Sequence, residues 1–235
     1  MVNVANSLAV IKKLCFEDGI CTFGELSGAV RKNWEGSAAL RRKALEVPHW
    51  GNDDDYVDSI FLDLFDDYCT WVKGQDNYLG RPYDPSMLAI STPVPFGRVC
   101  EAFPDGRLRG EPLADGVTSP YPGTDILGPT AVIRSSSKVD HTRIRGGLLN
   151  LKFHPSALKG ANGSHNLLAL IKTYFESPGF HVQFNVVDSN MLRDAQLHPE
   201  NYRNLVVRVA GFSAYWVEMS KALQDQVICR TEHNL

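Results

Sequence analysis

The sequence lacks the features that mark a nucleic-acid binder or a membrane protein. Lys and Arg number 24 against 27 Asp and Glu among 235 residues, a formal net charge of −3. A protein that binds nucleic acid needs a basic surface for the phosphates, so we expect no such partner. No apolar run approaches the ~20 residues of a membrane span. The first residues also lack the basic head and apolar stretch of a signal peptide. We therefore expect a cytoplasmic protein without membrane contact.

Cysteine is sparse and unpatterned. The five cysteines are odd in number, scattered, and include no C-x-x-C pair: Cys15, Cys21, Cys69, Cys100 and Cys229. This favours reduced thiols over a disulfide framework or a zinc site, and we expect no metal. Hydrophobic residues make up 43% and charged residues 22%, near the average for a globular domain, which excludes disorder for most of the chain.

Residues 5–75 are predicted to be helical, and we take residues 1–75 as a helical segment. Thr22 and Glu25 stand at capping-box spacing, so a helix is expected to begin there. Its apolar residues would be Leu26, Val30 and Trp34.

An acidic run, residues 53–55, is expected to open a long helix, because carboxylates are favourable near the positive end of a helix dipole. The same three carboxylates are potential metal ligands, but the sequence shows no second ligand cluster, so the helix-start interpretation is preferred. The apolar stripe of this helix is Val57, Ile60, Phe61, Leu64, Phe65 and Tyr68.

Residues 76–235 are expected to form an α/β unit. Residues 76–130 are rich in Gly and Pro and are predicted to be irregular, with a strand expected at Met87–Thr92. A short helix is predicted over Gly128–Ser137. Strands are then predicted at 148–153, 181–187 and 205–209, separated by helices at 166–175 and 191–196. This order implies parallel pairing with a right-handed crossover.

Two of these elements carry more specific expectations. The helix at 166–175 is apolar almost all around, so we expect it to be buried on several sides. In the strand at 181–187, Gln183 and Asn185 share one face. They either point into the interior toward a substrate or satisfy backbone groups, which is the commoner role of buried amides.

The strand at 205–209 stops at Gly211, and aromatic residues follow. Glycine at such a junction usually serves a turn that needs positive φ. However, the segment Arg208-Val-Ala-Gly-Phe-Ser-Ala214 resembles the radical-bearing motif of the glycyl radical enzymes, in the dehydratase and decarboxylase branch of the pyruvate formate-lyase-like superfamily. Phe212 stands where many members have Tyr. Further segments resemble the family in the same order: Gly51-Asn-Asp-Asp-Asp-Tyr-Val-Asp58, Val94-Pro-Phe-Gly97, Pro104-Asp-Gly-Arg107, Glu111-Pro-Leu-Ala-Asp-Gly116, Gly128-Pro-Thr-Ala-Val132, Gln183-Phe-Asn-Val-Val-Asp188, Leu192-Arg-Asp-Ala-Gln196 and Arg230-Thr231.

The resemblance, which covers the C-terminal portion of such enzymes, implies part of a ten-stranded α/β barrel. It implies a glycyl radical at Gly211, with no permanently bound cofactor, made by a radical S-adenosylmethionine activating enzyme. The radical is oxygen-sensitive and belongs to anaerobic chemistry. Phe212, Tyr215 and Trp216 are expected to shield it in a dry pocket. The expected supports of the radical loop are Arg208, Val209, Ala210, Phe212 and Ser213.

In the family, the stored radical passes to a cysteine several hundred residues upstream, but only 210 residues precede Gly211 here. Cys100 precedes a turn that is structural in the family, so we do not expect it to be the thiyl residue. The partner is then a cysteine-bearing N-terminal half or a full-length glycyl radical enzyme. The activity implied is lyase chemistry, dehydration or decarboxylation, on a small organic substrate.

Two alternatives to this catalytic component remain at this point. The first is a non-catalytic fragment or repair module that docks on a damaged enzyme. Known repair modules resemble only the extreme C-terminus of the family. A formate acetyltransferase type of acyl transfer is the other alternative. The pair Tyr215-Trp216 resembles arylacetate decarboxylases.

Overall fold

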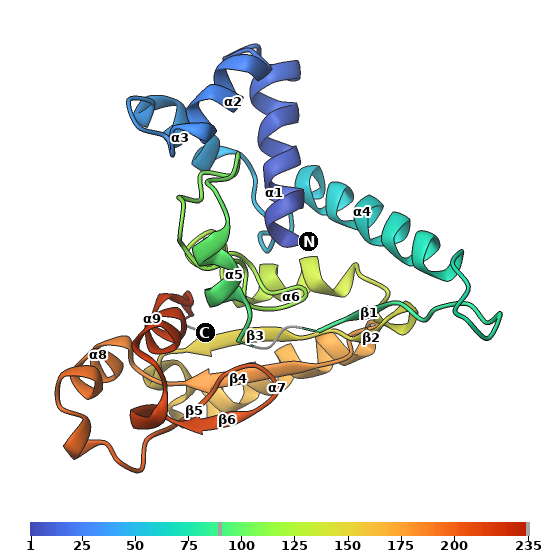
Figure 1. Cartoon of the computed structure of the whole chain (residues 1–235). Coiled ribbons are helices and arrows are strands. Elements are labelled where there is room, and N and C mark those ends of the chain that lie inside the picture. Colours follow the sequence, from blue (N-terminus) through green and yellow to red (C-terminus); the bar gives the residue numbers. More distant parts are fainter. Residues whose placement is uncertain (89–90, 234–235) are drawn as a thin grey trace.

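The computed structural model describes residues 1–88 and 91–233. It places a group of helices against an α/β layer (Figure 1). The predicted helical segment is confirmed. It comprises α1 (Val2–Ile11), which continues as the π-helical η1 (Lys12–Glu17), followed by α2 (Phe23–Arg31), α3 (Ala38–Glu46) and the long α4 (Asp55–Lys73). An apolar cluster holds these helices together and also includes residues from beyond 75, such as Val117 and Val139. The division between residues 75 and 76 stays a prediction.

The capping box at the start of α2 is confirmed. The Thr22 hydroxyl accepts the Glu25 N–H at 3.2 Å, and the Glu25 carboxylate accepts the Thr22 N–H at 2.7 Å. The expectation that this helix carries Trp34 is wrong. The helix ends at Arg31, and Trp34 has a positive φ of 64° in the turn that follows. This turn directs the indole into the core, where its N–H donates to the Phe103 carbonyl at 3.2 Å.

The acidic run starts α4 as predicted. Asp54 is the N-cap, and its carboxylate accepts the Tyr56 N–H at 2.9 Å. Lys138 neutralises the surrounding charge: its Nζ lies 2.8 Å from Asp55 and 2.7 Å from Asp58. Asp53 also contacts this amine, at 3.0 Å. Arg134 also lies 3.3 Å from Asp53, so the helix start and two cations give these carboxylates partners.

The middle of the chain is mostly irregular, as expected, but it contains a helix that the prediction missed, α5 (Pro93–Val99). The buried Arg107 stabilises its last turn and the loop after it, because its guanidinium donates to the carbonyls of Gly97 and Glu101, both at 2.8 Å. Of the strand expected at Met87–Thr92, only Met87 lies in a strand, β1 (Ser86–Met87). Thr92 is the N-cap of α5, and residues 89 and 90 lie outside the described residues. The predicted short helix is confirmed as α6 (Pro129–Ser137).

A parallel sheet lies at the centre of the last third. β3 (Leu149–Phe153) pairs on one side with β4 (Val182–Val186) and on the other with β7 (Glu232–His233). The long α7 (Gly160–Glu176) connects β3 to β4, so parallel pairing is confirmed for these two strands. In the described residues, the strands form three separate sheets rather than a closed barrel. A second sheet is the parallel pair of β1 with β2 (Arg145–Gly146), and the third is the antiparallel pair described next.

The strand expected at 205–209 does not join this parallel ladder. It forms β5 (Val206–Arg208), which pairs antiparallel with β6 (Ser213–Tyr215). Side chains rather than a backbone ladder connect it to β4, as described below. The predicted helix at 191–196 is confirmed as α8 (Ser189–Leu197), which flanks this region together with α9 (Lys221–Cys229).

The expectation that the apolar helix is buried on several sides is wrong. In α7, Leu170 and Tyr174 are buried in a cluster with β3 and α6. Leu168 is 48% exposed and Phe175 is 50% exposed. A helix at the outside of a layer contacts neighbours along one stripe, so the apolar residues around the rest of its circumference stay uncovered.

Candidate functional site

The candidate site is the hairpin of residues 206–215, hereafter the Gly211 hairpin. Its tip is closed by a hydrogen bond from the Val209 N–H to the Phe212 carbonyl, at 2.9 Å. Gly211 has a φ of +78°, in the region that glycine adopts readily and other residues rarely do. A Cβ built on Gly211 would meet no atom within 4 Å. Backbone conformation rather than lack of space therefore requires glycine here.

The polar face of β4 turns toward this hairpin. The Asn185 side chain makes a reciprocal pair with Arg208: its Nδ2 donates to the Arg208 carbonyl at 2.7 Å, and its Oδ1 accepts the Arg208 N–H at 2.8 Å. Asn185 is only 4% exposed. Of the two roles considered for these amides, satisfying backbone groups is the one that the structure confirms for Asn185.

Gln183 makes the second connection between β4 and the hairpin. Its Oε1 accepts the Gly211 N–H at 3.0 Å and the Nε of Arg208 at 3.1 Å. Its Nε2 donates to the Val209 carbonyl at 3.2 Å and to the side-chain oxygen of Asn150. Gln183 is 6% exposed, so this amide is also committed to the backbone of the hairpin.

A buried ion pair holds the hairpin from the other side. The guanidinium of Arg230 donates to the carbonyls of Arg208 (3.1 Å) and Val209 (2.6 Å), and it pairs with the carboxylate of Asp115. Both charged side chains are nearly inaccessible, at 6% and 4% exposed. Asp115 also accepts from the Asn150 amide at 3.2 Å. Every buried charge in this arrangement therefore has polar partners, as burial requires.

The predicted supports of the loop divide into a buried and an exposed set. Val209 and Ala210 are buried, and Arg208 donates to Ser213 Oγ at 3.3 Å as well as to Gln183. Phe212 is 40% exposed, and Gly211 is exposed as well. The described residues alone therefore do not enclose the glycine, and the expected dry pocket stays a prediction.

The flanking aromatics divide in the same way. Trp216 is fully buried among α8, α9 and Val207, whereas Tyr215 is 48% exposed. The hairpin lies at the edge of the described part of the chain (Figure 1).

Sequence reasoning missed the roles of Arg230 and Asp115, which are 115 residues apart. Both lie in segments that resemble the family, but a single sequence contains no signal that pairs two distant residues. The available hint was chemical. A lone arginine after an apolar helix stretch must find an anion and several acceptors if it is buried.

A second polar cluster lies at the carboxyl ends of the parallel strands. His154, Asp188 and Glu232 each offer a ligand atom, and these atoms lie within 4.8 Å of one another. However, Ser156 N–H donates to His154 Nδ1 at 3.2 Å, which leaves the proton of a neutral ring on Nε2, facing Asp188 at 3.6 Å. The Lys152 amine lies 3.9 Å from Glu232. These contacts give His154 and Glu232 polar partners within the protein, and the nearby lysine disfavours a cation.

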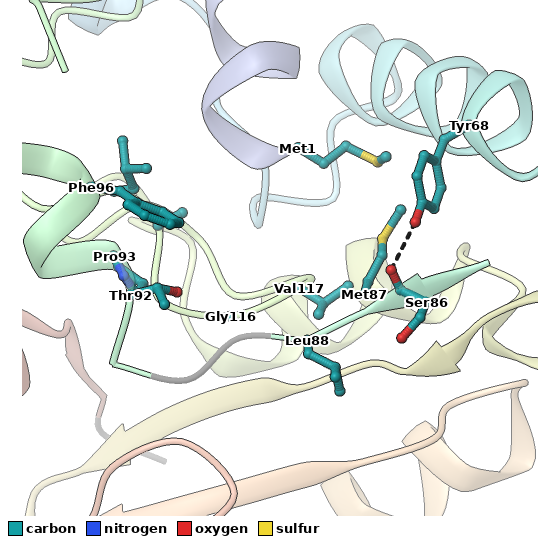
Figure 2. Close-up of a pocket in the computed structure, with 12 residues that line it drawn as sticks. Met1, Tyr68, Ser86, Met87, Leu88, Thr92, Pro93, Phe96, Gly116 and Val117 are labelled. Atoms are coloured by element: carbon teal, nitrogen blue, oxygen red, sulfur yellow. Dashed lines mark hydrogen bonds between the residues drawn. The ribbon is translucent and has the colours of Figure 1, made fainter. Parts of the chain in front are cut away.

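A cavity of about 440 Å³ lies between α1, α4, β1 and α5. Figure 2 shows Met1, Met87 and Phe96 around it, with the Tyr68 hydroxyl donating to the Ser86 carbonyl at 2.7 Å. The described side chains that line it include no carboxylate, imidazole or thiol. Among the described side chains, its polar groups are the hydroxyls of Tyr68, Ser86 and Thr92, so it can contact an apolar group that carries a hydrogen-bonding atom.

Comparisons with known proteins find two family models that match the chain. A family model described as pyruvate formate lyase-like matches residues 1–97, and one described as glycine radical matches residues 113–217. The chain is 46% identical to an indoleacetate decarboxylase of Tractidigestivibacter scatoligenes, over 99% of this chain. It is 40% identical to a trans-4-hydroxy-L-proline dehydratase of Clostridioides difficile, over 97% of this chain.

Solved structures give the same result. The glycerol-bound form of the B12-independent glycerol dehydratase from Clostridium butyricum superposes with a TM-score of 0.95 at 43% identity. It matches all of this chain, which covers 30% of that protein. The chain likewise spans 29% of the two curated relatives named above. Within the described residues, none of the helices is both long and apolar enough to cross a bilayer.

Proposed function

This chain belongs to the glycyl radical enzymes, in their dehydratase and decarboxylase branch, and on this premise we propose that Gly211 carries the radical. The observation that supports the proposal is the location of Gly211. It lies within the matched glycine radical region, at the tip of a hairpin whose backbone is held by Gln183, Asn185 and Arg230. In the described residues, these buried polar groups converge on the hairpin that carries Gly211.

The chemistry proposed for Gly211 is the loss of one hydrogen atom from Cα. The activating enzyme's iron–sulfur cluster gives one electron to S-adenosylmethionine, whose C–S bond breaks to release methionine and a 5′-deoxyadenosyl radical. This radical takes the hydrogen atom from Gly211 and becomes 5′-deoxyadenosine. The radical that remains is flanked by an amide nitrogen, which donates electron density, and a carbonyl, which accepts it. Both delocalise the unpaired electron when the centre is planar.

We place the cysteine that receives the radical on a partner: a cysteine-bearing N-terminal half or a full-length enzyme. Cys100 is at the C-terminal end of α5, where its N–H donates to the Phe96 carbonyl at 3.0 Å. This structural position is a poor one for a thiyl residue. The partner would cover the exposed face of the Gly211 hairpin, including Phe212 and Tyr215, and would complete the ten-stranded α/β barrel.

The reaction class that we propose is lyase chemistry on a small organic substrate, dehydration or decarboxylation. The names of the relatives support it: they describe an indoleacetate decarboxylase and a trans-4-hydroxy-L-proline dehydratase. These two substrates differ widely, so the class of reaction is the finest level that we propose. The match to residues 1–97, far upstream of the hairpin, favours an enzyme component over a short repair module.

Oxygen cleavage tests the proposal. The chain is activated anaerobically with its activating enzyme and then exposed to air, and the fragments are measured by mass spectrometry. A backbone radical at Gly211 reacts with oxygen and cuts the chain there, so the new fragment ends map to Gly211. In Gly211→Ala the cleavage should be absent. Cleavage at another residue, or an equal yield in the alanine variant, would place the radical elsewhere.

A further inference from the structure

We infer that Gln183 is a positioning residue for the Gly211 peptide, and that its side-chain carbonyl stabilises the radical through the Gly211 N–H. This inference rests on the proposed function. It assigns a task to a residue of β4 that is 28 positions away from the glycine.

The orientation of the Gln183 amide is determined by its neighbours. Its Oε1 lies against two donors, the Gly211 N–H and Arg208 Nε. Its Nε2 lies against two acceptors, the Val209 carbonyl and Asn150 Oδ1. A flipped amide would bring donor against donor and acceptor against acceptor in a buried place, where unpaired groups are costly. The carbonyl end is therefore the end that faces Gly211.

The neighbours of Gln183 are themselves held. Asn150 donates to Asp115, and its N–H donates to Ser119 Oγ at 2.8 Å. Arg230, paired with Asp115, donates to the same Val209 carbonyl that Gln183 binds. The Gln183 side chain is thus fixed from several directions, and the position of the Gly211 N–H follows from it. Networks of this kind are rigid when every member is satisfied.

The hydrogen bond to Gln183 is made by the Gly211 amide, the group over which a glycyl radical is delocalised. The unpaired electron is delocalised onto the amide nitrogen only when N, Cα and C lie in one plane. A hydrogen bond from the Gly211 N–H to a buried carbonyl holds the preceding peptide in a defined orientation. It also increases electron density at the nitrogen, because the carbonyl oxygen attracts the proton. Both effects favour the radical over the closed-shell glycine.

Two variants and a control separate this role from ordinary packing. Gln183→Leu removes both ends of the amide. Gln183→Glu keeps an acceptor for the Gly211 N–H but loses the donors to Val209 and Asn150. Gln196→Leu is the control, because Gln196 uses its amide on Asp225 at 2.8 Å, away from the Gly211 hairpin.

The first readout is amide hydrogen exchange at Gly211 in the full chain before activation. We expect exchange to accelerate by about tenfold or more in Gln183→Leu and to change little in Gln183→Glu and Gln196→Leu. If the leucine variant unfolds globally, the glutamate variant still decides, because the inference requires that Gly211 stays protected in it. Equal Gly211 exchange in wild type and a folded leucine variant, or loss of protection in a folded glutamate variant, would overturn the inference.

The second readout is the electron paramagnetic resonance of the activated full chain. We expect an altered splitting and faster decay of the signal in Gln183→Leu than in wild type or Gln196→Leu. An identical signal and lifetime would overturn the electronic part of the inference. A wild-type chain that gives no glycyl signal would instead contradict the proposed function, and the exchange result distinguishes that failure from this one.

Discussion

Arg230 and Asp115 form an ion pair that is almost fully buried, although 115 residues separate them in the chain. The arginine uses the rest of its guanidinium to bind two carbonyls of the Gly211 hairpin. The pair therefore connects the irregular middle of the chain, through the end of α9, to the hairpin that carries the candidate radical site.

Arg230→Met should strongly destabilise the chain. The change leaves the Asp115 carboxylate and the Val209 carbonyl buried with fewer partners, and breaking a buried pair in this way typically costs about 3–5 kcal/mol of the free energy of unfolding. Urea unfolding followed by circular dichroism measures it. The matched control is Lys221→Ala, which breaks an exposed i,i+4 pair with Asp225 and should cost less than about 0.5 kcal/mol. Equal costs for the two variants would show that the buried pair is not a structural anchor.

The buried amine of Lys152 should make the free energy of unfolding depend on pH. Burial lowers the pKa of Lys152 from 10.5 to about 8, since its side chain is 1% exposed. Between about pH 8 and 10.5 the folded chain has lost this proton and the unfolded chain still binds it. The free energy of unfolding should therefore rise with pH relative to that of Lys152→Met, by at most about 1.4 kcal/mol per pH unit.

The measurement is urea unfolding of both proteins at pH 7 and pH 10. Other titrating groups cancel in the difference between wild type and variant. We expect this difference to shift in favour of the wild type at the higher pH. A difference that stays constant, or shifts toward the methionine variant, would mean that the amine keeps its ordinary pKa in the fold.

Cys100→Ser should leave reconstituted turnover largely intact. Cys100 is the C-cap of α5, and its N–H donates to backbone carbonyls of that helix. The present proposal gives it a structural role and places the thiyl residue on the partner. The assay combines the activated variant with the cysteine-bearing partner and measures product. Loss of turnover, with assembly and radical signal both normal, would assign the thiyl role to Cys100.

The isolated chain should expose apolar surface that a partner covers. Leu168, Phe175, Phe212 and Tyr215 are each 40% exposed or more. We predict that these side chains contribute to contiguous apolar patches of the kind that mark an interface. We expect self-association in size-exclusion chromatography and strong binding of a hydrophobic dye, both reduced when the partner is added. A compact monomer that binds no dye would argue that these side chains need no cover.

The features that the sequence predicted correctly are those that depend on neighbouring residues. The Thr22–Glu25 capping box involves residues three apart, and the Asp54 cap acts on the next turn. The parallel pairing of β3 with β4 follows from a helix of sufficient length between two strands. The assignment of the radical to Gly211 rests on resemblance in a specific contiguous motif, and it stays a prediction.

The features that the sequence could not provide depend on distant residues. The apolar pattern of α7 indicates that its surface favours burial, but it does not say which neighbour covers it, and here only one stripe is covered. The strand at 205–209 is predicted to pair in parallel with its neighbours, yet it pairs antiparallel with the residues that follow Gly211. The same limit applies to Arg230 and Asp115, whose pairing exists only in the folded chain.

The most direct test of the central claim is electron paramagnetic resonance of the activated chain, prepared once with ordinary glycine and once with glycine deuterated at Cα. A radical on Gly211 couples to its single remaining α-hydrogen, so the account predicts a doublet that collapses to a narrow single line on deuteration. Gly211→Ala, with an unchanged circular dichroism spectrum, should give no such doublet. At φ +78° the alanine costs on the order of 1 kcal/mol, too little to unfold a typical domain. A doublet that persists in Gly211→Ala, or that deuterated glycine leaves unchanged, would contradict the assignment of the radical to Gly211.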